Sequence, residues 1–551
     1  MFEFVSTRLK CAVLSICMAV ALCVLQPTLL AQTHHGLIAS AQEASSASAA
    51  APSDQACQSR VNDTPDKLLE CIQETSLWNH LAHFQKISDQ HKGSDGHGNR
   101  DTGTAGYKAS VDYVAKLVRQ AGYHVTIQQY QYTASEVTGV PQFGTPDQSY
   151  AFTRDWLVAV RSGGGMLTAS IQPAAGSGNG CLAGDFATFV PGHIALLERG
   201  TCAYDAPVMN AEKAGAAAVI LYGSGNASPF QARLTRPATI PVVSVSYALG
   251  SELLRRYSTG NPPAVHLDIR MRPTSGVDYN LIAESPFGDP NHVVVVDAHL
   301  DSIYGAGMLD NASGSTTILE IALNMAKTST RNQLRYIWFG GEEIGLFGSA
   351  YYTTHLSSAQ RKRIAFDIDM DVTATPNFDI WIADPAFAYN VDQFPKNVVP
   401  QSKIGNRFFK DFFDSAGIVS QPSSFGNSGT DSNSFALIGI PDSGILTRQD
   451  CCKDQPEVDI WGGFLGNYEG TIPGSDGGCV DYPGRWCDNL SNNDPFVLGL
   501  ASKASAYVTF KLANHVFKAN HPERSPQPVE GGQAGGQSGK RTSPGGANED
   551  W

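Results

Sequence analysis

Positive charge is scarce in this sequence. Its 39 Lys and Arg residues face 52 Asp and Glu residues, which gives a formal net charge of −13 at pH 7. A deficit of this kind argues against nucleic acid or an anionic membrane surface as a general partner. Long apolar runs are also scarce: beyond the N-terminal segment, no stretch is apolar over the roughly 20 residues that a membrane span requires.

The N-terminal segment has the pattern of a secretion signal. Arg8 and Lys10 precede an apolar run over residues 11–25, and small residues follow. A run of this length is short for a membrane anchor, which is the alternative interpretation. We therefore expect residues 1–31 to be a signal peptide and the protein to be secreted, into the periplasm or the medium, without membrane contact after cleavage.

The cysteines are few, and none shows the CxxC spacing of a zinc ribbon. Three of the eleven lie within the expected signal, and an even number behind a signal favours disulfide bonds over metal ligands. The other eight fall into close groups: Cys57 and Cys71, Cys181 and Cys202, Cys451 and Cys452, Cys479 and Cys487. The adjacent Cys451 and Cys452 leave two alternatives: a vicinal disulfide with each other, or disulfides with other cysteines.

The sequence pattern changes several times along the 551 residues of the chain. This length exceeds that of one ordinary domain with a single core. Helix and strand patterns alternate in two separated parts, whereas the stretch between them is β-rich with many Gly and Pro residues. The expected organisation is a disordered linker over 32–56, α/β parts at 57–139 and 273–520, a β-rich insert at 140–272, and a disordered tail at 521–551.

Two apolar runs in the second α/β part end in chemically capable side chains. Residues 293–296 are four consecutive valines and residues 334–339 read LRYIWF, which predicts strands buried on both faces of a sheet. Open α/β sheets place their sites beyond the carboxyl ends of such strands. The polar residues that follow the two runs are His299, Asp301, Asp310, Glu342 and Glu343.

These residue types suit a hydrolytic zinc site. His299, Asp310 and Glu343 are zinc-ligand types, and one carboxylate can bridge two ions. Asp301 could accept from the imidazole and fix its tautomer. Glu342, adjacent to a ligand, is placed to act as a general base. Taken singly, a His-x-Asp motif or a Glu pair is most often surface charge, so the prediction depends on their combination at strand ends.

The order of HxD, LDNASG and a Glu pair resembles the M28 family of zinc peptidases over residues 60–138 and 273–510. The resemblance implies a mixed central sheet flanked by helices, with His299 on one zinc, Asp310 bridging, Glu343 on the other zinc, and Glu342 as base. Between the two parts, residues 192–223 resemble a protease-associated (PA) domain, a module that caps or steers access to a site and does no chemistry itself.

The family places a further aspartate ligand before a Ser-Pro-Asn-like turn, and here the sequence reads DIDMDVTATPN. The spacing to this turn selects Asp371, whereas the Asp-Met pair itself would select Asp369. We choose Asp371, because spacing fixes where the residue lies relative to the turn.

The last ligand of the family is a histidine between two C-terminal cysteines, and this chain lacks it. No histidine occurs between His355 and His515, and Asp481 stands where it would be, counting from Cys479. Asp481 is a chemically competent zinc ligand. Two zinc ions are therefore expected, or one if Asp481 does not bind and the second metal is weak or absent.

The resemblance implies a secreted zinc exopeptidase, an aminopeptidase acting on peptides or proteins. Two alternatives are open from the sequence. One is a single-zinc acyltransferase of the glutaminyl-cyclase type, which metal counting would separate from a two-zinc peptidase. The other is a non-catalytic binding ectodomain with a degenerate metal site. This alternative would be favoured if protein purified without chelator contained no zinc.

Overall fold

The computed structural model describes residues 52–517, except 94–95, 153, 201, 224–228, 231, 235, 388–393, 425–428, 450–452 and 470–485. The expected signal peptide, nearly all of the expected linker, the tail, and Asp481, Cys451, Cys452 and Cys479 lie outside the described residues. Helix α2 (Asp54–Ser59) includes residues 54–56, which we had expected in the linker. Ser53 caps it by accepting from the Ala56 amide, and a disulfide joins Cys57 to Cys71.

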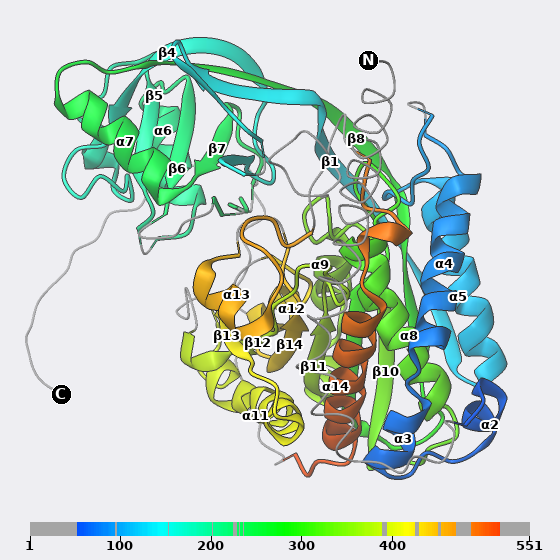
Figure 1. Cartoon of the computed structure of the whole chain (residues 1–551). Coiled ribbons are helices and arrows are strands. Elements are labelled where there is room, and N and C mark those ends of the chain that lie inside the picture. Colours follow the sequence, from blue (N-terminus) through cyan, green and yellow to red (C-terminus); the bar gives the residue numbers. More distant parts are fainter. Residues whose placement is uncertain are drawn as a thin grey trace, which may run out of the picture. The chain divides into compact units, whose positions relative to one another are not determined.

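A mixed sheet forms the centre of the α/β part (Figure 1). Strand β9 (Asp289–His299) lies between β10 (Asn332–Phe339) and β11 (Ile364–Met370), and all three are parallel. Beyond β11 lies β14 (Asp442–Leu446), which is parallel to β11. Next come β12 (Trp381–Asp384), which is antiparallel to β14, and β13 (Gln421–Ser424), which is parallel to β12. The predicted mixed sheet is confirmed, and residues 293–299 of β9 are buried throughout because helices cover both faces.

Successive side chains of β10 point to opposite faces of the sheet, so their contacts show which helices cover each face. The Trp338 indole donates to the Ser315 carbonyl of α8 (Ser313–Met325), which packs with α4 (Glu74–Gln90), α5 (Ala105–Ala121) and α14 (Pro495–Ala513). The neighbouring Ile337 belongs to a core shared with α9 (Phe347–Thr354) and α12 (Ser432–Leu437). The α/β part also contains α3 (Pro65–Cys71), α10 (Ser358–Arg363), α11 (Val398–Ala416) and α13 (Gln455–Trp461).

Two long antiparallel strands carry the chain into and out of the β-rich insert. Strand β1 (His124–Thr145) pairs with β8 (Ala264–Glu284), whose C-terminal end also pairs with β10. The alternation of residues 124–130 (HVTIQQY) predicts a strand there, and β1 continues well past residue 130 because β8 supplies partners along most of its length. Connected to this ladder are the insert's strands β2 (Gln148–Tyr150), β3 (Trp156–Val158), β4 (Gly165–Pro173), β5 (Ile194–Glu198), β6 (Ala218–Tyr222) and β7 (Val242–Val245).

The insert has its own cores. Strands β5, β6 and β7 are parallel neighbours with almost fully buried residues. Helices α6 (Asp205–Lys213) and α7 (Tyr247–Ser258) pack on this sheet, and a disulfide joins Cys181 to Cys202. Both disulfides of the described residues join cysteines that the sequence places in the same close group. Within that part of the chain, no helix combines the length and apolar character that a membrane crossing requires.

Candidate metal centre and active site

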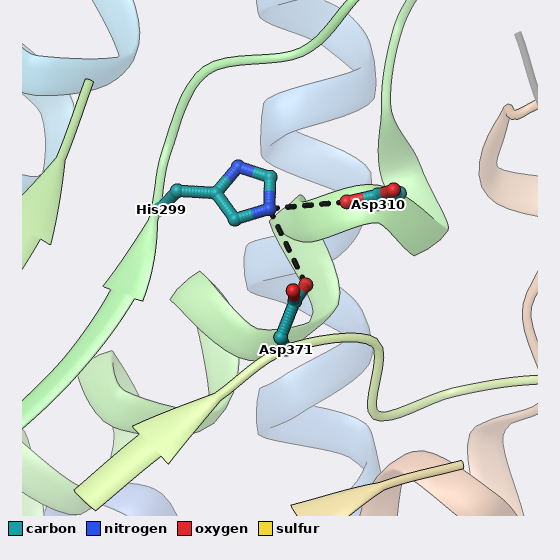
Figure 2. Close-up of side chains that lie close together, drawn as sticks. All are labelled: His299, Asp310 and Asp371. Atoms are coloured by element: carbon teal, nitrogen blue, oxygen red, sulfur yellow. Dashed lines mark ion pairs between the residues drawn. The ribbon is translucent and has the colours of Figure 1, made fainter. Parts of the chain in front are cut away.

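The histidine of the site lies at the carboxyl end of β9, and the first carboxylate follows in a tight turn. His299 is the last residue of β9, and Asp310 lies in the turn Met308–Ala312 directly before α8. Asp488 holds this turn, because its carboxylate accepts from the amides of Leu309 at 2.7 Å and Asp310 at 2.9 Å. The Asp310 side chain is thereby directed towards the end of β9 (Figure 2).

Three predicted ligands converge at this point. The Nε2 atom of His299 lies 3.0 Å from Asp310 Oδ1 and 3.3 Å from Asp371 Oδ1, as the dashed lines in Figure 2 show. One ligand atom from each residue lies within 4.8 Å of the others. Apart from these contacts within the group, His299 Nε2 and Asp371 Oδ1 have no hydrogen-bond partner among the described residues, although both atoms are buried. Orphaned, converging donors of this kind fit a cation such as zinc.

Asp371 and Asp369 occupy different environments. Asp371 follows the last residue of β11 and faces His299. Asp369 instead accepts from the Thr430 hydroxyl at 2.6 Å and from the Ser432 amide at 3.2 Å, in the segment that leads into α12. Burial, then the nearby Asp371 charge, raises the pKa of the Asp369 carboxyl to about 6. Asp369 thus holds a neighbouring loop, whereas Asp371 lies with the ligand group.

The second imidazole nitrogen meets a backbone carbonyl. His299 Nδ1 lies 3.2 Å from the carbonyl oxygen of Asp301 and 3.6 Å from its carboxylate. That carboxylate accepts from the Thr102 hydroxyl at 2.8 Å and from the amides of Glu342 and Glu343 at 3.3 and 3.4 Å. Asp301 therefore orients the imidazole through its main chain and holds the Glu pair through its side chain.

The two glutamates after β10 are held differently. Glu343, predicted as a ligand, is not part of the converging group of His299, Asp310 and Asp371, although its Oε1 atom is buried and has no hydrogen-bond partner in the described part of the chain. Burial, then the charge of Asp310, raises the pKa of the Glu343 carboxyl well above its usual range. Glu342 instead forms an ion pair with Arg233 of the insert at 3.0 Å. Burial raises the pKa of Glu342 to about 8, and Arg233 opposes this shift.

Two residues that contact the candidate site, Arg233 and Gln449, cannot be recognised from the sequence. Arg233 precedes Glu342 by 109 residues and lies in a domain expected to do no chemistry. Gln449, which follows β14, donates from its side-chain amide to Asp310 Oδ2, the carboxylate oxygen that does not face His299. Neither residue belongs to a motif, so only the folded chain reveals them.

A cavity of about 460 Å³ opens onto this group. Asp310, Glu342 and Asp371 line it from the peptidase part, and Arg233 lines it from the insert. Its walls include apolar side chains such as Phe152, Leu157 and Trp381. The cavity can therefore accept a small, partly apolar substrate group directly beside the ligands and the spare carboxylate.

A metal-type ligand group at strand ends, with an additional carboxylate beside it, defines the class of metal-dependent hydrolases. Comparison with known proteins gives the family. The family model described as "Peptidase family M28" matches residues 280–461, and the PA domain model matches residues 166–253. The chain is 32% identical over 484 residues, 84% of its length and 85% of the relative's, to a protein named "Aminopeptidase" from Pseudomonas aeruginosa. The chain belongs to peptidase family M28; it is a metallopeptidase with an inserted PA domain.

Other relatives extend this comparison. A "Probable lipoprotein aminopeptidase" from Mycobacterium tuberculosis is 30% identical over 78% of this chain and 83% of its own length. Among solved structures, the aminopeptidase from Aneurinibacillus sp. strain AM-1 has a TM-score of 0.56 at 19% identity, covering 84% of this chain and 99% of that one. A "Peptidase M28 precursor" from Shewanella amazonensis has a TM-score of 0.51 at 16% identity, covering 87% and 100%. At these identities the solved structures show the shared fold.

Proposed function

We propose that this protein is a secreted zinc aminopeptidase that removes N-terminal residues from peptides. The observation that carries the proposal is the convergence of His299, Asp310 and Asp371, with orphaned buried atoms, beside the spare carboxylate of Glu342. Several relatives are named as aminopeptidases, which supports the choice of the amino end. Disulfides at Cys57–Cys71 and Cys181–Cys202 support an oxidising compartment.

The proposed zinc ligands are His299, Asp310, Asp371 and Glu343, with Asp481 as a further ligand. Zinc bound there would polarise the scissile carbonyl and make its bound water more acidic. The count of ions depends on Asp481, which lies outside the described residues. Two ions are proposed if that carboxylate binds, and one if it does not.

The chain's own residues would then move the proton. Both Glu342 and Glu343 lie outside the converging group of His299, Asp310 and Asp371, but Glu342 is paired with Arg233 whereas Glu343 Oε1 has no hydrogen-bond partner among the described residues. Its carboxylate would accept the proton of the attacking water and deliver it to the leaving amine. Asp301 supports this role, because its carboxylate holds the Glu342 main chain and its carbonyl orients the His299 ring. The apolar walls of the cavity would receive the substrate's N-terminal side chain.

The test is Glu342→Gln, which keeps the shape of the side chain but cannot accept a proton. We expect kcat on aminoacyl arylamides to fall by roughly 10²–10⁴-fold, the usual contribution of a general base. Metal content, measured by elemental analysis, should stay at the wild-type value. Turnover at the wild-type rate would show that Glu342 is not the base.

Glu284→Gln provides a matched control. Glu284 is likewise paired with an arginine, Arg335, at 2.5 Å, but it does not line the cavity. The same isosteric change there should leave kcat within about twofold of wild type, because no group that touches the reaction changes. An equal loss in both variants would mean that general destabilisation, and not proton transfer, explains the effect.

A further inference from the structure

One arginine of the PA insert contacts the candidate base. Arg233 Nη2 lies 3.0 Å from Glu342 Oε1 and 2.9 Å from the Gly429 carbonyl oxygen. Both side chains of the ion pair are largely shielded, with 14% of Arg233 and 4% of Glu342 exposed. A single guanidinium nitrogen thus joins the insert, the loop after β10 and the segment before α12.

The backbone of Arg233 is anchored in the insert. The Val160 amide donates to the Ala232 carbonyl at 2.9 Å, and the Leu234 amide donates to the Val160 carbonyl at 3.3 Å. Ala232 and Leu234 are buried in the insert's core, so the residues on both sides of Arg233 are packed. The backbone that carries Arg233 is therefore held to Val160 by hydrogen bonds on both sides of the arginine.

Glu342 has acidic neighbours, so a contact such as that with Arg233 affects how its carboxylate is oriented. Asp310, Asp371 and Glu343 are acidic side chains that line the same cavity as Glu342. Like charges repel, and the carboxylate of a general base must lie within about hydrogen-bond reach of the proton that it takes. The contact with Arg233 restricts Glu342 to one orientation, and Gly429 restricts Arg233 in turn.

We propose that Arg233 is a positioning residue, supplied by the PA insert, that holds the Glu342 carboxylate in its working orientation. This inference rests on the proposed function, since it presupposes that Glu342 is the base. It also goes beyond the role expected of a PA domain, which was to cap or steer access. The insert completes the active site by supplying the partner of the base.

The experiment compares Arg233→Met and Arg233→Lys in the full-length protein, with aminoacyl arylamides as substrates. We expect Arg233→Met to lower kcat by roughly 10- to 100-fold, as for a misplaced catalytic group, with KM within about threefold and metal content unchanged. Arg233→Lys keeps the charge without the planar fork, so it should recover part of the loss. Arg236→Met is the control: Arg236 pairs with Glu212 inside the insert at 2.6 Å, and its loss should leave kcat within about twofold.

A double variant separates positioning from general destabilisation. If Arg233 acts through Glu342, adding Arg233→Met to Glu342→Gln should cause little further loss, because the two residues act as one unit. Multiplicative losses would overturn the proposal. A rise in kcat for Arg233→Met would also overturn it and indicate an inhibitory contact, and a rise in KM alone would indicate a substrate-binding contact.

The two proposals fail in different ways. If Glu342→Gln turns over at the wild-type rate, the proposed base is wrong, whatever Arg233 does. If Glu342→Gln is inactive while Arg233→Met matches Arg236→Met and wild type, the base stands and only the role of Arg233 is wrong.

Discussion

At the scale of single residues, the side chain of Gln449 bears on the number of metal ions. Its amide donates to Asp310 Oδ2, while Asp310 Oδ1 faces His299. In the bridging role that the resemblance implies for Asp310, each of its oxygens would serve one of two ions. Carboxylates that bind metal ions are commonly hydrogen-bonded as well, so the Gln449 amide would orient Asp310 Oδ2 and support binding at the second position.

Removing this amide should weaken the second position. For Gln449→Ala we expect the weaker zinc affinity to fall by roughly 10–100-fold, the usual cost of losing a hydrogen-bond partner of a metal ligand. Competitive zinc titration with elemental analysis measures both affinities. Gln449→Glu is the comparison, because it keeps the length of the side chain and removes the donor. An unchanged or stronger second site in both variants would show that Gln449 does not support the metal.

The same scale shows what motifs can and cannot predict. Spacing to a turn separated Asp371 from Asp369, and the structure places Asp371 beside His299 and Asp369 on Thr430. Arg233 and Gln449 could not be found in this way. Their contacts with Glu342 and Asp310 join segments 109 and 139 residues apart, and an isolated arginine or glutamine has no spacing to recognise.

At the scale of elements, Asp278 ties β8 to the loop before α5. Its carboxylate accepts from the amides of Gly103 and Tyr279, each at 2.9 Å, and only 1% of the residue is exposed. Burial, then the charge of Asp301, raises the pKa of Asp278 from 3.8 to about 8. The folded protein therefore holds this proton at pH values where the unfolded chain has lost it.

The sign of the pH dependence follows from that difference. Between pH 4 and 8 the folded state binds more protons at Asp278 than the unfolded state, so this group lowers the free energy of unfolding as the pH rises. Asp278→Asn removes the ionisation but keeps an acceptor oxygen. We expect it to match wild type near pH 4 and to exceed it by roughly 1–3 kcal/mol at pH 8 in denaturant unfolding. Asp112→Asn, at an exposed position of α5, controls for the loss of one charge; an equal gain there would refute the assignment.

Strand lengths show why element boundaries resist sequence reasoning. The alternation of residues 124–130 predicts the start of β1, but the strand runs to Thr145 because β8 pairs with it almost throughout. Helix α5 is closer to what the sequence predicts, because Val111, Val114, Ala115 and Val118 at helical spacing and the stop at Gly122 are local features, and the helix ends at Ala121. Pairing between residues more than a hundred positions apart is a tertiary property, and no local pattern encodes its extent.

At the scale of the whole molecule, several acidic side chains lie close together at the candidate metal centre. Asp310, Asp371, Glu342 and Glu343 come from three loops at the carboxyl ends of β9, β10 and β11, with a single histidine among them. The chain carries a net charge of −13, so distant charges do not offset this cluster. A divalent cation that binds only the folded arrangement should therefore stabilise the entire peptidase part.

Removing the metal tests this coupling. We expect a chelator to lower the midpoint of thermal unfolding, and zinc in excess to restore it, because a ligand at 100 times its dissociation constant stabilises the folded state by about 2.7 kcal/mol. His299→Ala removes the imidazole on which the two carboxylates converge, so its midpoint should be low already and respond little to either addition. Equal midpoints for wild type with and without chelator, with zinc confirmed absent by elemental analysis, would show that the carboxylates tolerate one another without a cation. In that case the raised pKa of Glu343 would point to protonation, and not to zinc, as the means by which the folded chain relieves the repulsion.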